Sequence, residues 1–345
     1  MKIPVKNIYY LLCYAWNKLD EGQRVFVNTS DYKDAAELLI RVLINGCNHL
    51  FKKGLDRDYI NVCEEYAGIK GKIDFSRTLN ANLLEKGRAF CITDEFEYDI
   101  LSNQLLKATL KKITKLRSLD STLKDVVWQA YFRLAGVSDI EPRLSLFSSV
   151  RVHRNNSNYD FLLQVCKLIL ESIVIDETRG KHTFIDFTGN DTTMANLYES
   201  FIRNFYRKEQ GEFVVDREYI SWQAEPTGVH ENNYLPRMQT DISLESSIRK
   251  IIIETKYYGS TLQTNFKSEK FHSSHLYQLY AYLRNVETKE NKPINAQAEG
   301  ILLYPTVDIT LSESYIIGGH KVSVKTVDLS KDWKEIHETL LSIIN

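Results

Sequence analysis

Two acidic residues and a lysine lie close together in the segment LPRMQTDISLESSIRKIIIETKYY, which runs from Leu235 to Tyr258. Asp241 precedes one apolar run, and Glu254 and Lys256 follow a second one. The second run has the β-branched and aromatic residues typical of a strand, and the polar residues before it are typical of a turn. The segment therefore predicts a β-hairpin with charged residues at its open end.

The register of this hairpin decides what chemistry the charged residues can do. If the turn is centred between Ser247 and Ile248, Asp241 lies directly opposite Glu254 on the neighbouring strand. Opposed residues have Cβ atoms ~5 Å apart, so the two carboxylates could share one divalent ion. Mg²⁺ prefers such oxygen ligands, and the carbonyl oxygen of Thr255 would be a third. Without a metal, the two carboxylates would repel each other.

Lys256 adds a positive charge beside this predicted metal site. A bound metal lowers the pKa of a coordinated water and stabilises negative charge on a phosphodiester. An ammonium group next to it can hold the attacking water and neutralise the developing oxyanion. The structural alternative is that Glu254 and Lys256 only form an ion pair on an edge strand. The acidic residue at hairpin distance favours the metal site over this alternative.

Helical patterns flank the hairpin on both sides. Upstream, residues 196–209 have apolar residues at helical spacing and include Glu199. Downstream, residues 275–285 place Gln278 and Tyr282 four positions apart, on one face of a helix. Taken singly, Glu199 fits a solvated position on a helix and Tyr282 fits a core position. In this order, the helix, hairpin and helix resemble the PD-(D/E)XK nuclease superfamily. That resemblance implies that Glu199 joins the metal site and that Gln278 and Tyr282 position the substrate.

The remaining pattern predicts two domains of different fold class. A chain of 345 residues exceeds the ~100–200 residues usual for one domain. Residues 1–155 predict a mostly helical domain with a protruding β-hairpin over residues 58–79. Residues 156–345 interleave strands with helices, which predicts an α+β or α/β domain with a central mixed sheet flanked by helices. The polar segment 149–158 is the predicted linker between them.

Composition narrows the functional classes. The net charge of −1 argues against a uniformly basic nucleic-acid coat, although not against a local basic face. No stretch reaches the ~20 apolar residues of a membrane helix, and the N-terminus lacks the pattern of a signal peptide. The five cysteines are scattered and odd in number, which favours buried thiols in a reducing compartment such as the cytoplasm.

A glycine-flanked basic loop carries Lys70 and Lys72 in the first half of the chain. Its spacing differs from that of a Walker A motif, which needs four residues between its glycines and a hydroxyl after Gly-Lys. We find no other nucleotide-binding loop, so any nucleotide would be bound by a partner. The protruding loop is instead a candidate for contact with that partner.

Several stretches together resemble one family over nearly the whole chain. They are IPVKNIYYLLCYAW, GIKGKIDF, EFEYDILSNQLLKATL, LPRMQTDI, IETKYY and EKFHSSHLYQLYAYL. They resemble the McrC family, the nuclease subunits of the McrBC modification-dependent restriction systems of bacteria and archaea. The resemblance implies a partner that forms a hexameric AAA+ ring, hydrolyses GTP and recognises methylated cytosine in double-stranded DNA. It also implies that this subunit cuts the DNA and stimulates the partner's GTPase through an N-terminal domain inserted into the ring.

The resemblance assigns the family's catalytic positions to Asp241, Glu254 and Lys256. Many relatives in the wider superfamily carry Asp at the position of Glu254, and either carboxylate can bind the ion. The expected activity is Mg²⁺-dependent hydrolysis of DNA, and the expected site of GTPase stimulation is the loop of Lys70 and Lys72. Two alternatives are a non-cleaving adaptor that activates a ring NTPase, and a stand-alone RecB-like repair nuclease. The intact charged residues argue against the adaptor, and the large N-terminal half argues against the stand-alone nuclease.

Overall fold

The chain forms two compact units in the computed structural model. One comprises Met1–Asp20, Asn28–Ala35 and Asp186–Asn345 and is called the sheet unit here; the other comprises Glu21–Val27 and Ala36–Ile185 and is called the helical unit. The structure describes residues 3–20, 32–150, 157–176, 181–225, 234–257, 262–265, 268–287, 289, 292–306 and 310–345.

This division differs from the predicted boundary between residues 155 and 156 in the placement of two helices. Helix α1 (Val5–Ala15) belongs to the sheet unit because it packs against α9 (Asp191–Glu209). The side chain of Asn7 holds α1 there by donating hydrogen bonds of 2.8 Å to two backbone carbonyl groups near residue 330. Helix α8 (Ser157–Ser172) belongs to the helical unit. Most of the predicted linker, 151–156, lies outside the described residues.

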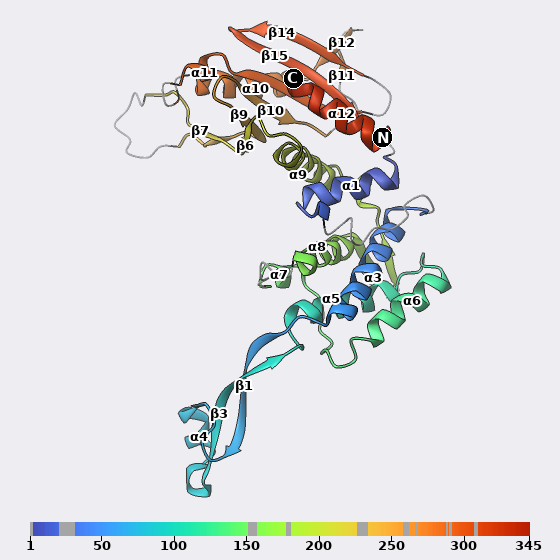
Figure 1. Cartoon of the computed structure of the whole chain (residues 1–345), viewed down its shortest axis with the longest axis vertical. Coiled ribbons are helices and arrows are strands. Elements are labelled where there is room, and N and C mark those ends of the chain that lie inside the picture. The colour runs from blue at the N-terminus through green and yellow to red at the C-terminus, as the bar shows by residue number, and fades with distance from the viewer. Residues whose placement is uncertain are drawn as a thin grey trace. The chain divides into compact units, whose positions relative to one another are not determined.

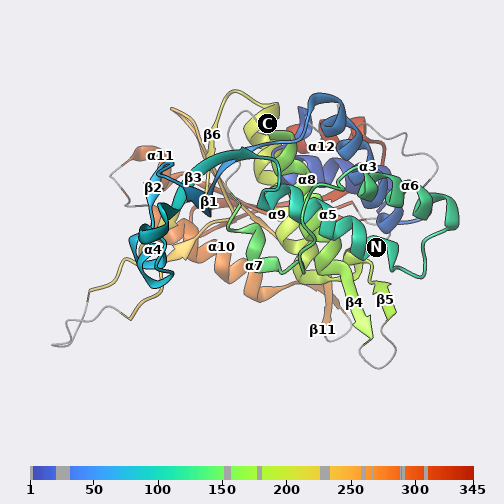
Figure 2. The same ribbon diagram turned by 90° about the horizontal axis from the view of Figure 1, so that it is seen from below.

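The helical unit is built on packed amphipathic helices. Its long helices are α3 (Ala35–Lys53), α5 (Leu101–Thr114), α6 (Ser121–Phe132) and α8. Helix α5 is buried over most of its length, and α8 runs beside it in both views (Figures 1 and 2). The shorter elements are α7 (Leu144–Phe147) and the antiparallel pair β4 (Ile173–Asp176) and β5 (Lys181–Phe184).

A long antiparallel ribbon projects from these helices (Figure 1). It consists of β1 (Asp58–Ala67) and β3 (Arg88–Glu97), which pair along their whole length. The predicted hairpin over 58–79 is wrong in its pairing, because β2 (Lys72–Ile73) also pairs with β3 and not with β1. The chain after β2 turns into α4 (Phe75–Asn80) and a 3-10 turn (Leu84–Lys86) before it enters β3. The loop with Lys70 and Lys72 therefore lies near the end of the ribbon and folds back along it, so that Lys72 pairs with Ile92.

The sheet unit contains a six-stranded sheet in the order β14-β15-β13-β10-β9-β6. Strand β13 is parallel to both β10 and β15, and the other pairs are antiparallel. The predicted fold class, a mixed sheet flanked by helices, is confirmed. The six strands are β6 (Val214–Asp216), β9 (Ile242–Glu245), β10 (Lys250–Thr255), β13 (Glu299–Thr306), β14 (Ser312–Ile317) and β15 (His320–Asp328).

Helices cover the sheet of this unit. Helix α10 (Ser273–Val286) packs its apolar residues on Ile252, Leu302 and Val324 of the sheet. Helix α9 contacts β10 and β6, and α12 (Trp333–Ile344) contacts β15. The remaining short elements are η4 (Phe187–Gly189), β7 (Tyr219–Ile220), β8 (Met238–Gln239), β11 (Leu262–Asn265), β12 (Ser268–Phe271) and α11 (Pro293–Ala296).

Two expectations from composition can be compared with the structure. None of the five cysteines forms a disulfide, and Cys13, Cys47, Cys91 and Cys166 are buried, as predicted. Over the described part of the chain, no helix combines the length and the apolar character that a membrane span requires.

Close packing between α10 and the sheet depends on Gly300 of β13. A Cβ atom at this position would lie 2.8 Å from Leu283 Cδ1 and 3.0 Å from Leu279 Cδ2, and both leucines are fully buried. We expect Gly300→Ala to lower the free energy of unfolding by about 1–3 kcal/mol, the usual cost of overpacking a core. Thermal unfolding should detect this as a lower midpoint. The matched control is Gly211→Ala, where nothing lies within 4 Å of the added Cβ; equal midpoints for the two variants would contradict the expectation.

Candidate active site

The hairpin of β9 and β10 has the predicted register. Lys250 pairs with Glu245 and Ile253 pairs with Ile242, so the next opposed pair is Asp241 and Glu254. Asp241 immediately precedes β9, where its Oδ2 accepts hydrogen bonds from the backbone N–H of Thr255 at 2.9 Å and from the Thr255 hydroxyl at 2.8 Å. The two carboxylates therefore lie at the same end of the hairpin, and Thr255 fixes the orientation of one of them.

Glu254 is buried with an unsatisfied carboxylate oxygen. Its side chain is 2% exposed, and Oε1 accepts a hydrogen bond of 2.6 Å from Lys256 Nζ. Its other oxygen, Oε2, has no hydrogen-bond partner among the described residues. Burial raises the pKa of Glu254 to about 7, with a further contribution from the negative charge of Asp241 and an opposing one from Lys256. A cation placed between the two carboxylates would relieve both the repulsion and the missing contact.

Lys256, Gln278 and Tyr282 form a chain of hydrogen bonds. Lys256 Nζ donates to Gln278 Oε1 at 2.9 Å, and Gln278 Nε2 donates to the Tyr282 hydroxyl at 2.8 Å. The Tyr282 hydroxyl in turn donates to the backbone oxygen of Gln239 at 2.9 Å. Gln278 and Tyr282, which the sequence placed on one face of a helix, are therefore in direct contact in the structure. In this arrangement Gln278 and Tyr282 orient the ammonium group of Lys256.

Glu199 of α9 lies on the wall of the same cleft but bonds to arginines. Its Oε1 accepts from Arg203 Nη1 at 2.6 Å and also from Arg217. Arg203 Nη1 additionally lies 3.4 Å from the backbone oxygen of Asp241. The negative charge of Glu199 also acts on Glu254, because it contributes to the raised pKa of Glu254. Its predicted part in the metal site stays a prediction.

These side chains surround a cleft of about 530 Å³. Among the residues that the structure describes, no group of three or more His, Cys, Asp and Glu side chains is placed to hold a metal ion. Two carboxylates and a backbone carbonyl still fit Mg²⁺, which keeps several waters and commonly uses only one or two carboxylates. The cleft is lined by Asp191, Thr192, Ala195, Asn196, Glu199, Asp241, Glu254, Thr255, Lys256, Tyr257 and Gln278.

Some of these contacts were not predicted from the sequence. Arg203 follows Glu199 by four residues on a helix, so helical spacing alone could have revealed that ion pair. Arg217 lies on the segment between β6 and β7, and no local signal connects it to Glu199.

Lys70 and Lys72 belong to the helical unit, where both are exposed and the Lys70 ammonium lies 4.7 Å from the centre of the Tyr66 ring.

Comparison with known proteins gives the class of this chain. Residues 6–305 match the family model of the "McrBC 5-methylcytosine restriction system component". The chain is 34% identical over 343 residues to the "Type IV methyl-directed restriction enzyme EcoKMcrBC" of Escherichia coli (strain K12), an alignment that covers 99% of this chain and 97% of the relative. It is therefore a component of a restriction system. The chain belongs to the McrBC family.

Two solved structures from Thermococcus gammatolerans are also similar. One is a half-complex from a tetradecameric assembly of McrB AAA+ hexamers with bound McrC, with a TM-score of 0.56, 16% identity, and coverage of 99% of this chain and 76% of that chain. This likeness shows a shared fold. The other is the cryo-EM structure of the McrBC complex, with a TM-score of 0.43, 17% identity, and coverage of 61% and 60%.

The raised pKa of Glu254 predicts how the stability of the metal-free protein depends on pH. Below the ordinary pKa of 4.5 the carboxyl is protonated in both the folded and the unfolded state, so its burial has little effect. As the pH rises toward 7 the unfolded state ionises first, and the folded state loses relative stability. In EDTA we therefore expect Glu254→Gln to raise the stability by up to about 3 kcal/mol at pH 8 and by much less at pH 5.

Thermal unfolding at the two pH values measures this difference. The matched control is Glu313→Gln, because Glu313 is exposed on β14 and the change should be nearly neutral at both pH values. A Glu254→Gln variant that is destabilised at pH 8 would contradict the burial argument.

Proposed function

We propose that this chain is the endonuclease subunit of a GTP-dependent McrBC-type complex, and that it hydrolyses phosphodiester bonds in DNA that contains methylated cytosine. The observation that supports this most directly is the pair formed by Asp241 and the buried Glu254, beside the ammonium group of Lys256. An acidic pair with an unsatisfied oxygen is costly to keep unless a cation binds it. The order of helix, hairpin and helix around it fits a PD-(D/E)XK nuclease.

The residues of the cleft have distinct roles in this proposal. Asp241 and Glu254 would hold Mg²⁺ together with the Thr255 carbonyl, and the ion would supply an activated water and stabilise negative charge on the phosphate. Lys256 would neutralise charge that develops on the phosphate oxygens, because Gln278 fixes its ammonium group beside Glu254. Tyr282 would keep Gln278 in the correct orientation through their hydrogen bond.

The proposal also includes a partner. The Thermococcus gammatolerans structure contains McrB AAA+ hexamers with bound McrC, and we propose that a McrB-like hexamer binds this chain and carries the GTP site. The helical unit would dock on it, acting in the cytoplasm where the DNA lies. At the end of the ribbon, Ile69, Phe75 and Leu79 are 74%, 61% and 57% exposed. Exposed apolar side chains next to Lys70 and Lys72 suit an interface with another protein.

Substitution of Asp241 tests the cleavage chemistry. In a complex reconstituted with the partner, GTP, Mg²⁺ and methylated DNA, we expect Asp241→Asn to reduce the cleavage rate at least about a hundredfold, because the electrostatic stabilisation of the transition state is lost. Stimulation of the partner's GTPase should persist. Asp216→Asn is the matched control, since Asp216 has a side chain 75% exposed and lies outside the cleft.

Two outcomes would count against the cleavage proposal. If Asp241→Asn cuts DNA within a few-fold of the wild type, the acidic pair does not hold the catalytic ion. If the wild-type complex stimulates GTP hydrolysis but never cuts DNA, the chain is an adaptor with a vestigial nuclease site.

Charge reversal at the end of the ribbon tests the docking role. We expect the double substitution of Lys70→Glu and Lys72→Glu to abolish stimulation of the partner's GTPase, because both exposed ammonium groups become carboxylates. The matched control reverses Lys52 and Lys53, two neighbouring exposed lysines of α3. Rates of GTP hydrolysis with and without each variant give the answer. Normal stimulation by the ribbon variant would remove the proposed role of the loop.

A further inference from the structure

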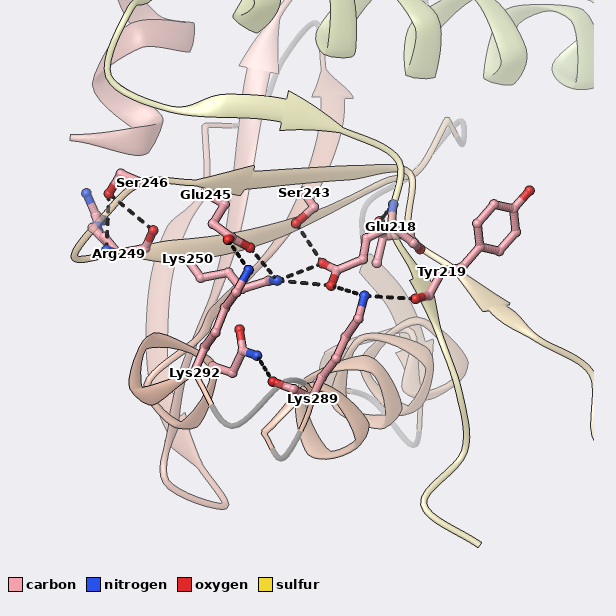
Figure 3. Close-up of polar contacts among 11 residues, drawn as sticks. Glu218, Tyr219, Ser243, Glu245, Ser246, Arg249, Lys250, Lys289 and Lys292 are labelled. Atoms are coloured by element: carbon pink, nitrogen blue, oxygen red, sulfur yellow. Dashed lines mark hydrogen bonds and ion pairs between the residues drawn. The ribbon is translucent and has the colours of Figure 1, made fainter.

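A polar pocket of about 670 Å³ lies beside β9 and β6 of the sheet unit. Its centre is the carboxylate of Glu218, which accepts hydrogen bonds from Lys250 Nζ at 3.0 Å, Lys289 Nζ at 2.7 Å and Ser243 Oγ at 2.9 Å (Figure 3). The side chain of Lys250 is 2% exposed and also donates to Glu245 at 2.9 Å. Burial would raise the pKa of Glu218, but the hydrogen bonds from Lys250 and Lys289 lower it overall. Glu218 is therefore a part-buried carboxylate that stays charged.

The backbone at Glu218 is also fixed next to the candidate active site. The Glu218 N–H donates to the Thr240 hydroxyl at 3.0 Å, and the Thr240 N–H donates to the Glu218 carbonyl at 3.0 Å. Thr240 is fully buried and directly precedes Asp241 in the chain. The segment that contains Glu218 is thus held relative to Asp241 by both its main chain and its side chain.

This anchored segment carries Arg217, which lines the pocket around Glu218 and reaches Glu199 on the wall of the catalytic cleft. Arg217 contacts Oε1 of Glu199, the same oxygen that Arg203 contacts. One carboxylate and two guanidinium groups carry a net charge of +1. The other charged residues that line the cleft are Asp191, Asp241, Glu254 and Lys256. The side chain of Arg217 is 41% exposed, whereas that of Arg203 is 13% exposed. The excess positive charge is therefore accessible on Arg217.

We propose that Arg217 binds a backbone phosphate of the DNA strand in the cleft, and that Glu199 is its positioning residue. A planar guanidinium group can make two parallel hydrogen bonds to a phosphate, and it keeps its charge at any working pH. The polar network around Glu218 holds the backbone of Arg217 in place before DNA arrives, which reduces the entropy lost on binding. This inference rests on the proposed nuclease function, because it needs DNA to enter the cleft.

DNA binding without cleavage tests this role. We would measure the affinity of the full chain for a fluorescent DNA duplex in EDTA, between 50 and 200 mM salt, by fluorescence anisotropy. Each phosphate contact contributes about 0.9 to the slope of log affinity against log salt concentration. We expect Arg217→Gln to make this slope shallower by about one contact and to weaken binding about tenfold at low salt.

Two further variants make the result specific. Arg207→Gln removes the same charge from a side chain that is 45% exposed and pairs with Asp216, outside the cleft, so it should leave the slope unchanged. Arg217→Lys keeps the charge and should keep the slope, even if it weakens binding. The midpoint of thermal unfolding of each variant shows whether the fold is intact.

The role of Arg217 is overturned if Arg217→Gln keeps the wild-type slope, if Arg207→Gln changes it by the same amount, or if the wild-type chain does not bind the duplex at 50 mM salt. Because the assay contains no divalent ion, its result is independent of the cleavage assay with Asp241→Asn. The nuclease proposal can therefore stand when this inference fails, and a phosphate contact can be present in a chain that does not cut.

Discussion

The burial of Glu254 beside Asp241 is the constraint that the rest of the sheet unit must satisfy. Two carboxylates that face each other at the end of a hairpin repel, and burial makes the charged form of Glu254 still less favourable, as its raised pKa shows. The fold compensates in part: Thr255 donates two hydrogen bonds to Asp241, and Lys256 donates one to Glu254. The oxygen that remains unsatisfied is the observation on which the proposed cation site rests.

Apolar packing holds this unfavourable arrangement in place. The central strand β10 is buried along its whole length, and Ile252 on the same face as Glu254 packs on Leu279 and Leu283 of α10. The same helix carries Gln278, which bonds to Lys256, and Tyr282, which bonds to the backbone before β9. Helix α10 therefore both packs on the core and orients Lys256. A change in the packing of α10 would also displace the ammonium group.

The sequence predicted these local features because short-range patterns determine them. The two-residue alternation of a strand and a polar turn are enough to set the register that opposes Asp241 and Glu254. The ribbon was predicted incorrectly because the partner of β1 begins at Arg88, beyond a segment that itself contains strand and helix. The contact of Arg217 with Glu199 and the ion network of Glu218 join residues from separate elements, and no periodicity within one element reports such contacts. The contact of α1 with α9 likewise joins segments that are far apart in the sequence.

The distribution of charge explains why a nuclease of this kind would depend on a partner. In the pocket around Glu218, each of Lys250, Lys289 and Lys292 forms an ion pair with Glu218 or Glu245, so these lysines are largely engaged within the protein. The whole chain has a net charge of −1. Affinity for DNA comes largely from release of counterions by unmatched cations. The cleft supplies little of it, because its carboxylates outnumber Lys256 and the two arginines that pair with Glu199. Such a subunit can position and cut a strand that another protein holds, whereas it would capture free DNA weakly.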